Sequence, residues 1–350
     1  MIYYLKDGVY EEGLLKNAGS KAREDCEAIF NARGYLPLYI TTSNKGIDNY
    51  NALKHELGKL KENDSIILSI ALYFPTIRIK NILNDLKRRN IKAIVFVHDL
   101  NVIRRGFNYY QPWVRFPVPK HEVHNEEYEL LKNADYIICH NYKMAKLLKK
   151  IFHKPKVFTL NCFDYLSNYE DISNVENKIE GVVVAGNLCK DKSTYLYSLP
   201  KDINFFLYGV GYDETFKQRN INYCGSFFPN ELIQYIYIYT YGLIWDGNST
   251  KKCSGRCGKY NKINNPHKLS LYLAAGLPVI VWAKSAIAKF VKDNEIGICV
   301  NNLDEIIDKI HECNYQKIKD NALKIGEKVR KGDFLNTCLN QLESNIKDTY

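Results

Sequence analysis

Residues 261–282 bring together groups that could hold a phosphate, in the order NKINNPHKLSLYLAAGLPVIVW. Asn265 is a favourable N-cap and Pro266 then takes the first position of a short helix, which predicts a loop, a helix, a tight turn and a buried strand. His267 and Lys268 fall in the first turn, where the helix dipole disfavours cations. A bound anion would remove that conflict. The alternative is a solvated loop lysine beside a surface histidine.

Three predicted strands in the same half end in glycine-containing fragments, at residues 186–190, 208–211 and 245–247. Their candidate ligand-binding residues are Asn187, Lys190, Gly209 and Asp246, which join Asn264, Asn265, His267 and Lys268. Glycine lets a backbone approach a phosphate closely, and ligands of open α/β sheets bind beyond the carboxyl ends of the strands. These three fragments and residues 264–268 together predict a site for a nucleoside diphosphate. The chain lacks a P-loop and any Asp-x-Asp, so we predict no metal site.

In the first half, His98 and Asp99 follow the most β-like run of the chain. An imidazole and a carboxylate at a strand end could act as a general base, or as a base and the group that orients it. The alternative is an aspartate that caps the next loop and a histidine in a domain seam. Residues 104–113 then form a basic, aromatic segment without helix or strand period, which suits a sugar, a phosphate or a membrane surface, or packs on its own domain.

Composition bounds the class of protein. A chain of 350 residues with 46% hydrophobic and 25% charged residues is expected to be globular, with about two domains. No apolar run approaches the ~18 residues that a membrane span needs, and the first residues do not resemble a signal peptide. We therefore expect a cytoplasmic protein. The net charge of +10 is spread along the chain without a nucleic-acid-binding motif, and we therefore predict no nucleic-acid partner. Ten scattered cysteines fit reduced thiols, although a reversible disulfide between Cys253 and Cys257 is not excluded.

Strands and helices alternate along most of the chain, which predicts parallel sheets covered by helices. In the first half we expect strands at 2–5, 36–40, 65–70, 91–97, 136–139 and 157–160. In the second half we expect them at 181–185, 204–208, around Tyr223, and at 241–245, 277–282 and 296–300. The pattern stops between 161 and 177. We therefore predict an α/β fold with domains at 1–162 and 178–350, the second with a helical tail, and a linker at about 163–177.

Several of these segments resemble one family of glycosyltransferases. The matching segments are Ala18-Gly19-Ser20-Lys21-Ala22, His98-Asp99, Gly186-Asn187-Leu188, residues 241–247 and residues 264–273. They are similar to motifs of bacterial β-1,6-galactofuranosyltransferases and of the glucosyltransferases that extend GlcNAc on serine-rich-repeat adhesins. The resemblance covers at least residues 15–300. It implies a GT-B fold, with two Rossmann-like domains facing across a cleft.

The resemblance also implies a metal-independent transfer from a UDP-sugar donor, with no cofactor. By the family pattern, Lys268, Asn265 and Lys190 would hold the diphosphate and Tyr223 would lie near the uracil. Gly19 and Ser20 would close over the donor from the opposite domain. The family gives no role to Cys139-His140 or to the Cys253–Cys257 loop.

We therefore predict an inverting hexosyltransferase whose base is Asp99 first and His98 second. The acceptor would be a saccharide, either lipid-linked at the inner membrane face or on a glycoprotein, and both a peripheral membrane contact and a homo-oligomer are compatible with the sequence. Two alternatives stay open: a nucleotide-sugar epimerase of the same architecture, which would need no acceptor, and a UDP-sugar-binding subunit without catalysis.

Overall fold

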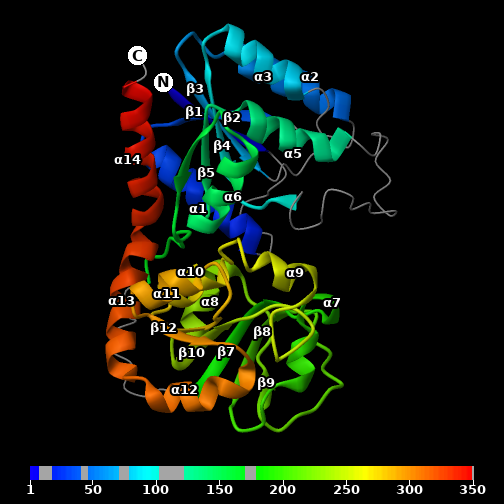
Figure 1. Cartoon of the computed structure of the whole chain (residues 1–350), viewed down its shortest axis with the longest axis vertical. Coiled ribbons are helices and arrows are strands. Elements are labelled where there is room, and N and C mark those ends of the chain that lie inside the picture. The colour runs from blue at the N-terminus through cyan, green and yellow to red at the C-terminus, as the bar shows by residue number, and fades with distance from the viewer. Residues whose placement is uncertain (8–17, 41–45, 71–78, 102–121, 170–178, 349–350) are drawn as a thin grey trace. The chain divides into compact units, whose positions relative to one another are not determined.

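A computed structural model describes residues 1–7, 18–40, 46–70, 79–101, 122–169 and 179–348, and its backbone contacts divide the chain into two units (Figure 1). Unit 1 comprises residues 1–14, 26–160 and 336–350, and unit 2 comprises residues 15–25 and 161–335. The predicted segment 104–113 lies outside the described residues. Among the described helices, none is both long and apolar enough to cross a bilayer.

Unit 1 is built on a parallel six-stranded sheet in the order β2-β1-β3-β4-β5-β6. The strands are β1 (Ile2–Asp7), β2 (Leu36–Ile40), β3 (Ser65–Ile70), β4 (Lys92–Val97), β5 (Tyr136–Cys139) and β6 (Lys156–Thr159). The connecting helices are α1 (Ala18–Ala32), α2 (Gly46–Gly58), α3 (Ile79–Arg88), α5 (Glu122–Asn133) and α6 (Tyr142–Ile151). All six strands occur where the apolar runs predict them, because both faces of a parallel sheet are covered and must be apolar.

Unit 2 contains a second parallel sheet, in the order β12-β11-β10-β7-β8-β9. Its strands are β7 (Ile179–Asn187), β8 (Phe205–Val210), β9 (Ile221–Tyr223), β10 (Tyr239–Ile244), β11 (Val279–Trp282) and β12 (Gly297–Val300). Its helices are α7 (Lys190–Ser193), α8 (Pro229–Ile236), α9 (Gly255–Tyr260), α10 (Lys268–Ala274), α11 (Ala288–Asp293), α12 (Ile306–Glu312) and α13 (Tyr315–Lys331), with 3₁₀ turns at Thr194–Ser198 and Leu303–Glu305.

The core of unit 2 has two layers, one on each face of its sheet. One contains α8, α10 and α13, through buried residues such as Ile233, Leu273 and Ala322. The other contains the 3₁₀ turn after α7 and the start of α12, through Tyr195 and Ile306. The strand order reverses between β7 and β10, and a parallel sheet binds ligands at the carboxyl ends of the strands at such a point.

The boundaries of the units differ from the predicted domains at the C-terminal end. Helix α14 (Asp333–Lys347) begins in unit 2, but residues from 336 onward belong to unit 1. The cause is a polar cluster within unit 1: Arg33 donates to Glu343 at 2.8 Å and to Asn336 at 3.1 Å, and Tyr35 donates to Glu343 at 2.5 Å. Residues 336–348 therefore pack with unit 1, whereas the predicted second domain runs to residue 350.

The first part of the predicted linker, residues 163–169, belongs to unit 2 by its backbone contacts. The carboxylate of Asp164 accepts hydrogen bonds from the backbone N–H groups of Phe334 and Leu335, at 3.2 and 2.7 Å. The backbone N–H of Tyr165 donates to the carbonyl of Val329 at 3.0 Å. This stretch has no helix or strand period because its polar groups bond to α13 and α14 rather than to a neighbouring strand.

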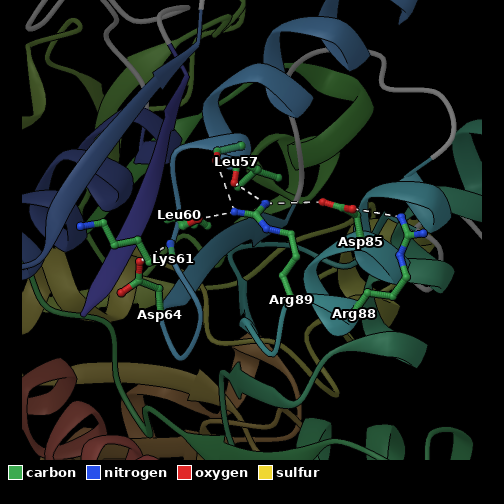
Figure 2. Close-up of polar contacts among 8 residues, drawn as sticks. Leu57, Leu60, Lys61, Asp64, Asp85, Arg88 and Arg89 are labelled. Carbon is green, nitrogen blue, oxygen red and sulfur yellow. Dashed lines mark hydrogen bonds and ion pairs between the residues drawn. The ribbon is translucent and has the colours of Figure 1, made fainter.

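Arg89, the residue that follows α3, holds the end of α2 in unit 1 (Figure 2). Arg89 donates to the carbonyls of Leu57 at 2.9 Å and Gly58 at 3.3 Å, and also to that of Leu60. Leu57 and Gly58 are the last two residues of α2, where carbonyls run out of helical partners, and a cation there also complements the helix dipole; Leu60 lies two residues beyond the helix. Arg88, by contrast, is 78% exposed and contacts only Asp85 among the described residues.

We expect Arg89→Ala to lower the free energy of unfolding by about 2 kcal/mol, because it leaves helix-end carbonyls without a charged donor. The matched control is Arg88→Ala, whose loss of an exposed ion pair should change stability by less than about 0.5 kcal/mol. Urea unfolding of the full chain, followed by circular dichroism, measures both. Equal losses in the two variants would show that Arg89 does not hold the end of α2.

Candidate functional site

Two glycines open the carboxyl ends of β7 and β8. Gly209 has φ +146°, and a Cβ at this position would lie 1.8 Å from the carbonyl oxygen of Gly186. Gly186 has φ +118°, and a Cβ there would lie 3.3 Å from the Cε atom of Lys268. The absence of side chains therefore lets the two strand ends approach each other and lets Lys268 lie against the end of β7.

Lys268, Asp246 and Lys192 form a charged cluster at this edge of the sheet. Lys268 is the first residue of α10, Asp246 follows β10, and Lys192 lies in α7. The Nζ atoms of Lys268 and Lys192 lie 3.4 and 3.9 Å from the Oδ1 atom of Asp246. The side chains of Lys268 and Asp246 are only 10% and 7% exposed, whereas that of Lys192 is 28% exposed. The cluster is therefore mostly buried, with one cation at its rim.

The ionisation of the cluster reflects burial and the mutual attraction of its members. Burial alone would raise the pKa of Asp246, but Lys268 and Lys192 outweigh it, so the pKa is lowered and the carboxylate stays charged. Burial lowers the pKa of Lys268, and Asp246 offsets part of that change. With all three groups charged the cluster carries a net positive charge. Among the described residues, the side chain of Lys268 has one hydrogen bond, the one to Asp246, although an ammonium has three donors. An anion would use the remaining donors.

Lys192 is the member of this cluster that the sequence analysis missed. Its carbonyl accepts a hydrogen bond from the N–H of Gly247 at 2.9 Å, which fixes α7 beside the residue after Asp246. Ser193 donates from its hydroxyl to the carbonyl of Asn187 at 2.9 Å, and Asn187 in turn accepts from the N–H of Cys189. These bonds hold the turn after β7. A second lysine two residues after Lys190 was the available signal.

Lys190 is paired elsewhere. Its ammonium contacts the carboxylate of Asp213 at 2.6 Å and lies 4.9 Å from the centre of the Tyr197 ring. The bond to Lys190 holds the pKa of Asp213 down to about 2. Tyr223 lies nearby through Tyr212, on which its ring stacks at 5.4 Å, and its hydroxyl donates to the carbonyl of Gly209 at 2.9 Å. An aromatic group and a lysine therefore flank the end of β8.

The helix carrying Lys268 begins later than predicted. Asn265 is not its N-cap, because α10 starts at Lys268 with His267 as the flanking residue, and the side-chain amide of Asn265 donates to the carbonyl of Asn161 at 2.9 Å. Asn264 lies just before it, and its Oδ1 atom is buried with no hydrogen-bond partner among the described residues. That oxygen would accept from a donor group on a ligand.

His267 is not a second cation, which corrects the prediction of a cationic pair. Its ring stacks on Tyr165 at 5.2 Å, and its Nε2 atom lies 3.3 Å from the carbonyl oxygen of Asp164. Burial and the nearby charge of Lys21 lower the pKa of His267 to about 4, so the ring is neutral at pH 7. The conflict with the helix dipole is therefore confined to Lys268, whose charge Asp246 partly balances.

Gly19 and Ser20 lie in the first turn of α1, so Ser20 is inside this helix rather than at its N-cap. By their backbone contacts they belong to unit 2, and their closing over the donor stays a prediction. The next residue, Lys21, donates to the carbonyl of Leu166 at 2.9 Å, and its ammonium lies 4.8 Å from the centre of the Tyr165 ring. The start of α1 is thus linked through Tyr165 to His267.

In unit 1, His98 and Asp99 lie just beyond β4, as predicted. Both backbone N–H groups donate to the carbonyl of Ile70 at the end of β3, at 2.5 and 3.2 Å. His140, which follows β5, places its Nε2 atom 3.1 Å from the carbonyl oxygens of Val97 and His98. Burial lowers the pKa of His140 to about 4, so it is a neutral structural donor. These contacts give His140 a structural role, which the sequence alone did not predict.

No group of three or more potential metal-binding side chains of His, Cys, Asp or Glu occurs in the part of the chain that the structure describes. Cys253 and Cys257 are not joined by a disulfide, and burial raises the pKa of Cys253 to about 12. The charged cluster around Asp246 thus presents amines rather than metal-binding carboxylates to a ligand.

Two family models match the chain. The glucosyltransferase 3-like N-terminal domain matches residues 8–162, and the glucosyltransferase 3-like C-terminal domain matches residues 182–342. The β-1,6-galactofuranosyltransferase WbbI of Escherichia coli (strain K12) is 31% identical over 359 residues, covering 99% of both chains. Glucosyltransferase 3 of Streptococcus gordonii is 23% identical over 254 residues, covering 72% of this chain and 69% of the relative.

Solved structures show the same fold at low identity. A sucrose-phosphate synthase from Thermosynechococcus elongatus matches with a TM-score of 0.64 at 13% identity, over 100% of both chains. The pneumococcal O-GlcNAc transferase GtfA, solved with UDP and GlcNAc, matches with a TM-score of 0.52 at 15% identity; the match covers 85% of this chain and 59% of GtfA. Two Rossmann-like units on parallel sheets, with these neighbours, are a GT-B fold. The chain belongs to the glucosyltransferase 3-like family and is a glycosyltransferase.

Proposed function

We propose that this protein transfers a hexose from a UDP-sugar to a saccharide acceptor, with inversion and without a metal. The observation that carries the proposal is the buried cluster of Lys268, Asp246 and Lys192 at the point where the strand order of unit 2 reverses. The names of the relatives, a galactofuranosyltransferase and a glucosyltransferase, support a hexose, with galactofuranose, glucose and galactose as candidates. GtfA, whose fold is similar, was solved with UDP.

The diphosphate of the donor would bind to Lys268 and Lys192 beside the ends of β7 and β8. After its contact with Asp246, the ammonium of Lys268 still has N–H groups that can donate. Because Gly186 has no side chain, the side chain of Lys268 can lie against the end of β7. Asn187, Gly209 and Asn264 would line this place, and Tyr223 would receive the nucleoside end beside the ion pair of Lys190 and Asp213. Gly19, Ser20, Asn265 and His267 would support the segments around the donor rather than carry charge.

The leaving UDP gains negative charge on its β-phosphate as the glycosidic bond to the donor sugar breaks. A preformed donor aimed at such charge is worth about 3 kcal/mol, or roughly a hundredfold or more in rate. Lys268 and Lys192 would supply this stabilisation, which many enzymes obtain from a metal ion. Asp246 holds Lys268 in place and keeps it protonated.

The acceptor hydroxyl would lose its proton to Asp99, or to His98, as it attacks the anomeric carbon. Attack from the face opposite the leaving UDP inverts that carbon. The backbone of this pair is fixed by Ile70 and by His140. Polysaccharide, O-antigen or glycoprotein glycan synthesis would use such a transfer, with the acceptor carried on a lipid or on a protein. A lipid-linked acceptor would place the protein in peripheral contact with the inner membrane face, and association into a homo-oligomer is part of the same proposal.

A UDP-release assay tests the function directly. We expect UDP release from UDP-glucose, UDP-galactose or UDP-galactofuranose to require a saccharide acceptor and to continue in excess EDTA, because lysines rather than a metal neutralise the diphosphate. Consumption of the donor without an acceptor would indicate an epimerase. A loss of more than about tenfold in EDTA, restored by a divalent cation, would show that a metal does take part.

The roles of Lys190 and Lys268 can be distinguished by measuring UDP affinity and turnover in single variants. We expect Lys268→Ala to lower kcat by about a hundredfold, since it removes a buried donor to the leaving group. Lys190→Ala is the comparison, and we expect less than about a threefold loss because Asp213 already pairs with this exposed lysine. If Lys190→Ala is as damaging as Lys268→Ala, Lys190 contacts the diphosphate together with Lys268, as the resemblance implies.

The base can be identified by substitutions that keep the shape of the side chain. Asp99→Asn should abolish acceptor-dependent UDP release while leaving UDP affinity unchanged, because it removes a proton acceptor in unit 1 and no donor-binding group in unit 2. His98→Gln should reduce the rate less. Full activity in Asp99→Asn together with loss of activity in His98→Gln would assign the base to His98.

A further inference from the structure

Helix α6 of unit 1 exposes a row of lysines. Its inner side packs through Met144, Ala145 and Leu148, all of which are buried. Its start is fixed because the side chain of Asn141 accepts a hydrogen bond from the N–H of Met144 at 3.1 Å. The outer side carries Tyr142, Lys146, Lys149 and Lys150, which are all exposed. Lys146 follows Tyr142 by four residues, and Lys149 and Lys150 follow Lys146 by three and four residues, so these side chains lie on one stripe of the helix, which we call the cationic face.

The charge of the cationic face is not balanced locally. Residues 136–163 contain six lysines and no aspartate or glutamate. Lys154 pairs with Asp135 at 3.4 Å, and Lys156 donates to Asn345. Lys146, Lys149 and Lys150 form no ion pair with any residue that the structure describes. These three charges are therefore available to an external anion.

Other surface helices of the protein differ in this respect. Lysines on α11, α12 and α13 pair with acids three or four residues away, as in Lys289–Asp293, Lys309–Glu312 and Lys331–Glu327. Such pairs neutralise the helix surface and favour solubility. The absence of any acid within α6 gives its face a different character from those helices.

The cationic face also presents an aromatic ring. Tyr142 is 70% exposed at the start of α6, and Ile151 is 37% exposed at its end. Tyrosine rings are favoured at membrane–water interfaces, and lysines bury their hydrocarbon stems there while the ammonium stays at the headgroups. A row of lysines between a tyrosine and an isoleucine therefore suits a lipid headgroup layer better than a nucleic-acid groove, where arginines and stacked aromatic rings are expected.

We propose that the cationic face of α6 binds to a membrane surface containing anionic phospholipid. This inference assigns a surface to the peripheral membrane contact of the proposed function. It rests on the proposed function only for its biological purpose, which is to bring the protein to a lipid-linked acceptor. Vesicle binding is measured without donor or acceptor. A failure of this proposal would therefore leave the transferase assignment standing, and the reverse is also true.

The test compares binding of the full chain to vesicles of phosphatidylcholine containing about 30 mol% phosphatidylglycerol with binding to pure phosphatidylcholine. We expect binding only to the anionic vesicles, and weaker binding as sodium chloride rises from about 0.05 to 0.5 M, because salt screens exposed charges. In the triple variant Lys146→Gln, Lys149→Gln, Lys150→Gln, a loss of about fivefold per lysine gives about a hundredfold weaker partitioning. Glutamine keeps helix propensity, so α6 should still form.

The matched control is Lys324→Gln, Lys328→Gln, Lys331→Gln on α13, which removes the same charge from another exposed helix of the protein. We expect less than about a threefold change in partitioning for this control. Tyr142→Ser should weaken binding severalfold, and that loss should persist at high salt. UDP affinity and the thermal midpoint should be unchanged in the α6 and α13 triple variants, which shows that both remain folded.

The proposal is overturned if the wild-type chain does not bind the anionic vesicles, or if the α6 and α13 triple variants lose the same affinity. It is also overturned if the protein does not bind the anionic vesicles but binds a DNA duplex through Lys146, Lys149 and Lys150. That result would assign the cationic face to nucleic acid. Loss of vesicle binding confined to the α6 variants supports it.

Discussion

A buried carboxylate held between two lysines organises the second unit of this protein. Burial of Asp246, whose side chain is 7% exposed, raises its pKa, and Lys268 and Lys192 outweigh that effect; burial lowers the pKa of Lys268, and Asp246 offsets part of that change. The three side chains come from α7, from the residue after β10 and from α10, so each element must end at the right place. The charge balance therefore links the end of β10 to the positions of α7 and α10.

Neutral histidines support the ends of strands and helices in both units. His140 bonds to the carbonyls beyond β4, and His267 stacks on Tyr165 before α10. Burial holds the pKa of each at about 4, so neither brings a charge that would have to be balanced in the interior. A neutral imidazole can still donate one hydrogen bond, which is what a carbonyl at a strand end requires. Two residues that look reactive in the sequence therefore have structural roles.

The polar residues at strand ends show how an open parallel sheet separates stability from chemistry. The inner strands, such as β3, β4 and β11, are apolar and buried on both sides, so they supply the core. The residues after them, such as Asp99 and Asp246, lie beyond the strands, where polar side chains can be placed without interrupting the apolar core. In a glycosyltransferase of this fold, the proposed proton acceptor follows a strand of unit 1 and the proposed donor-binding cations surround strand ends of unit 2.

The sequence alone determined the parallel sheets, every described strand of unit 1 and the place of the phosphate candidate, because apolar runs and glycine-containing strand ends depend on local pattern. It also gave the family, through residues 264–273 and a few shorter motifs. Only the tertiary structure decided that His267 is neutral, that Lys190 pairs with Asp213 while Lys192 joins Lys268, and that residues from 336 onward belong to unit 1. These outcomes depend on burial and on contacts between residues far apart in the chain, such as Lys192 with Asp246 and Arg33 with Glu343, which no local pattern records.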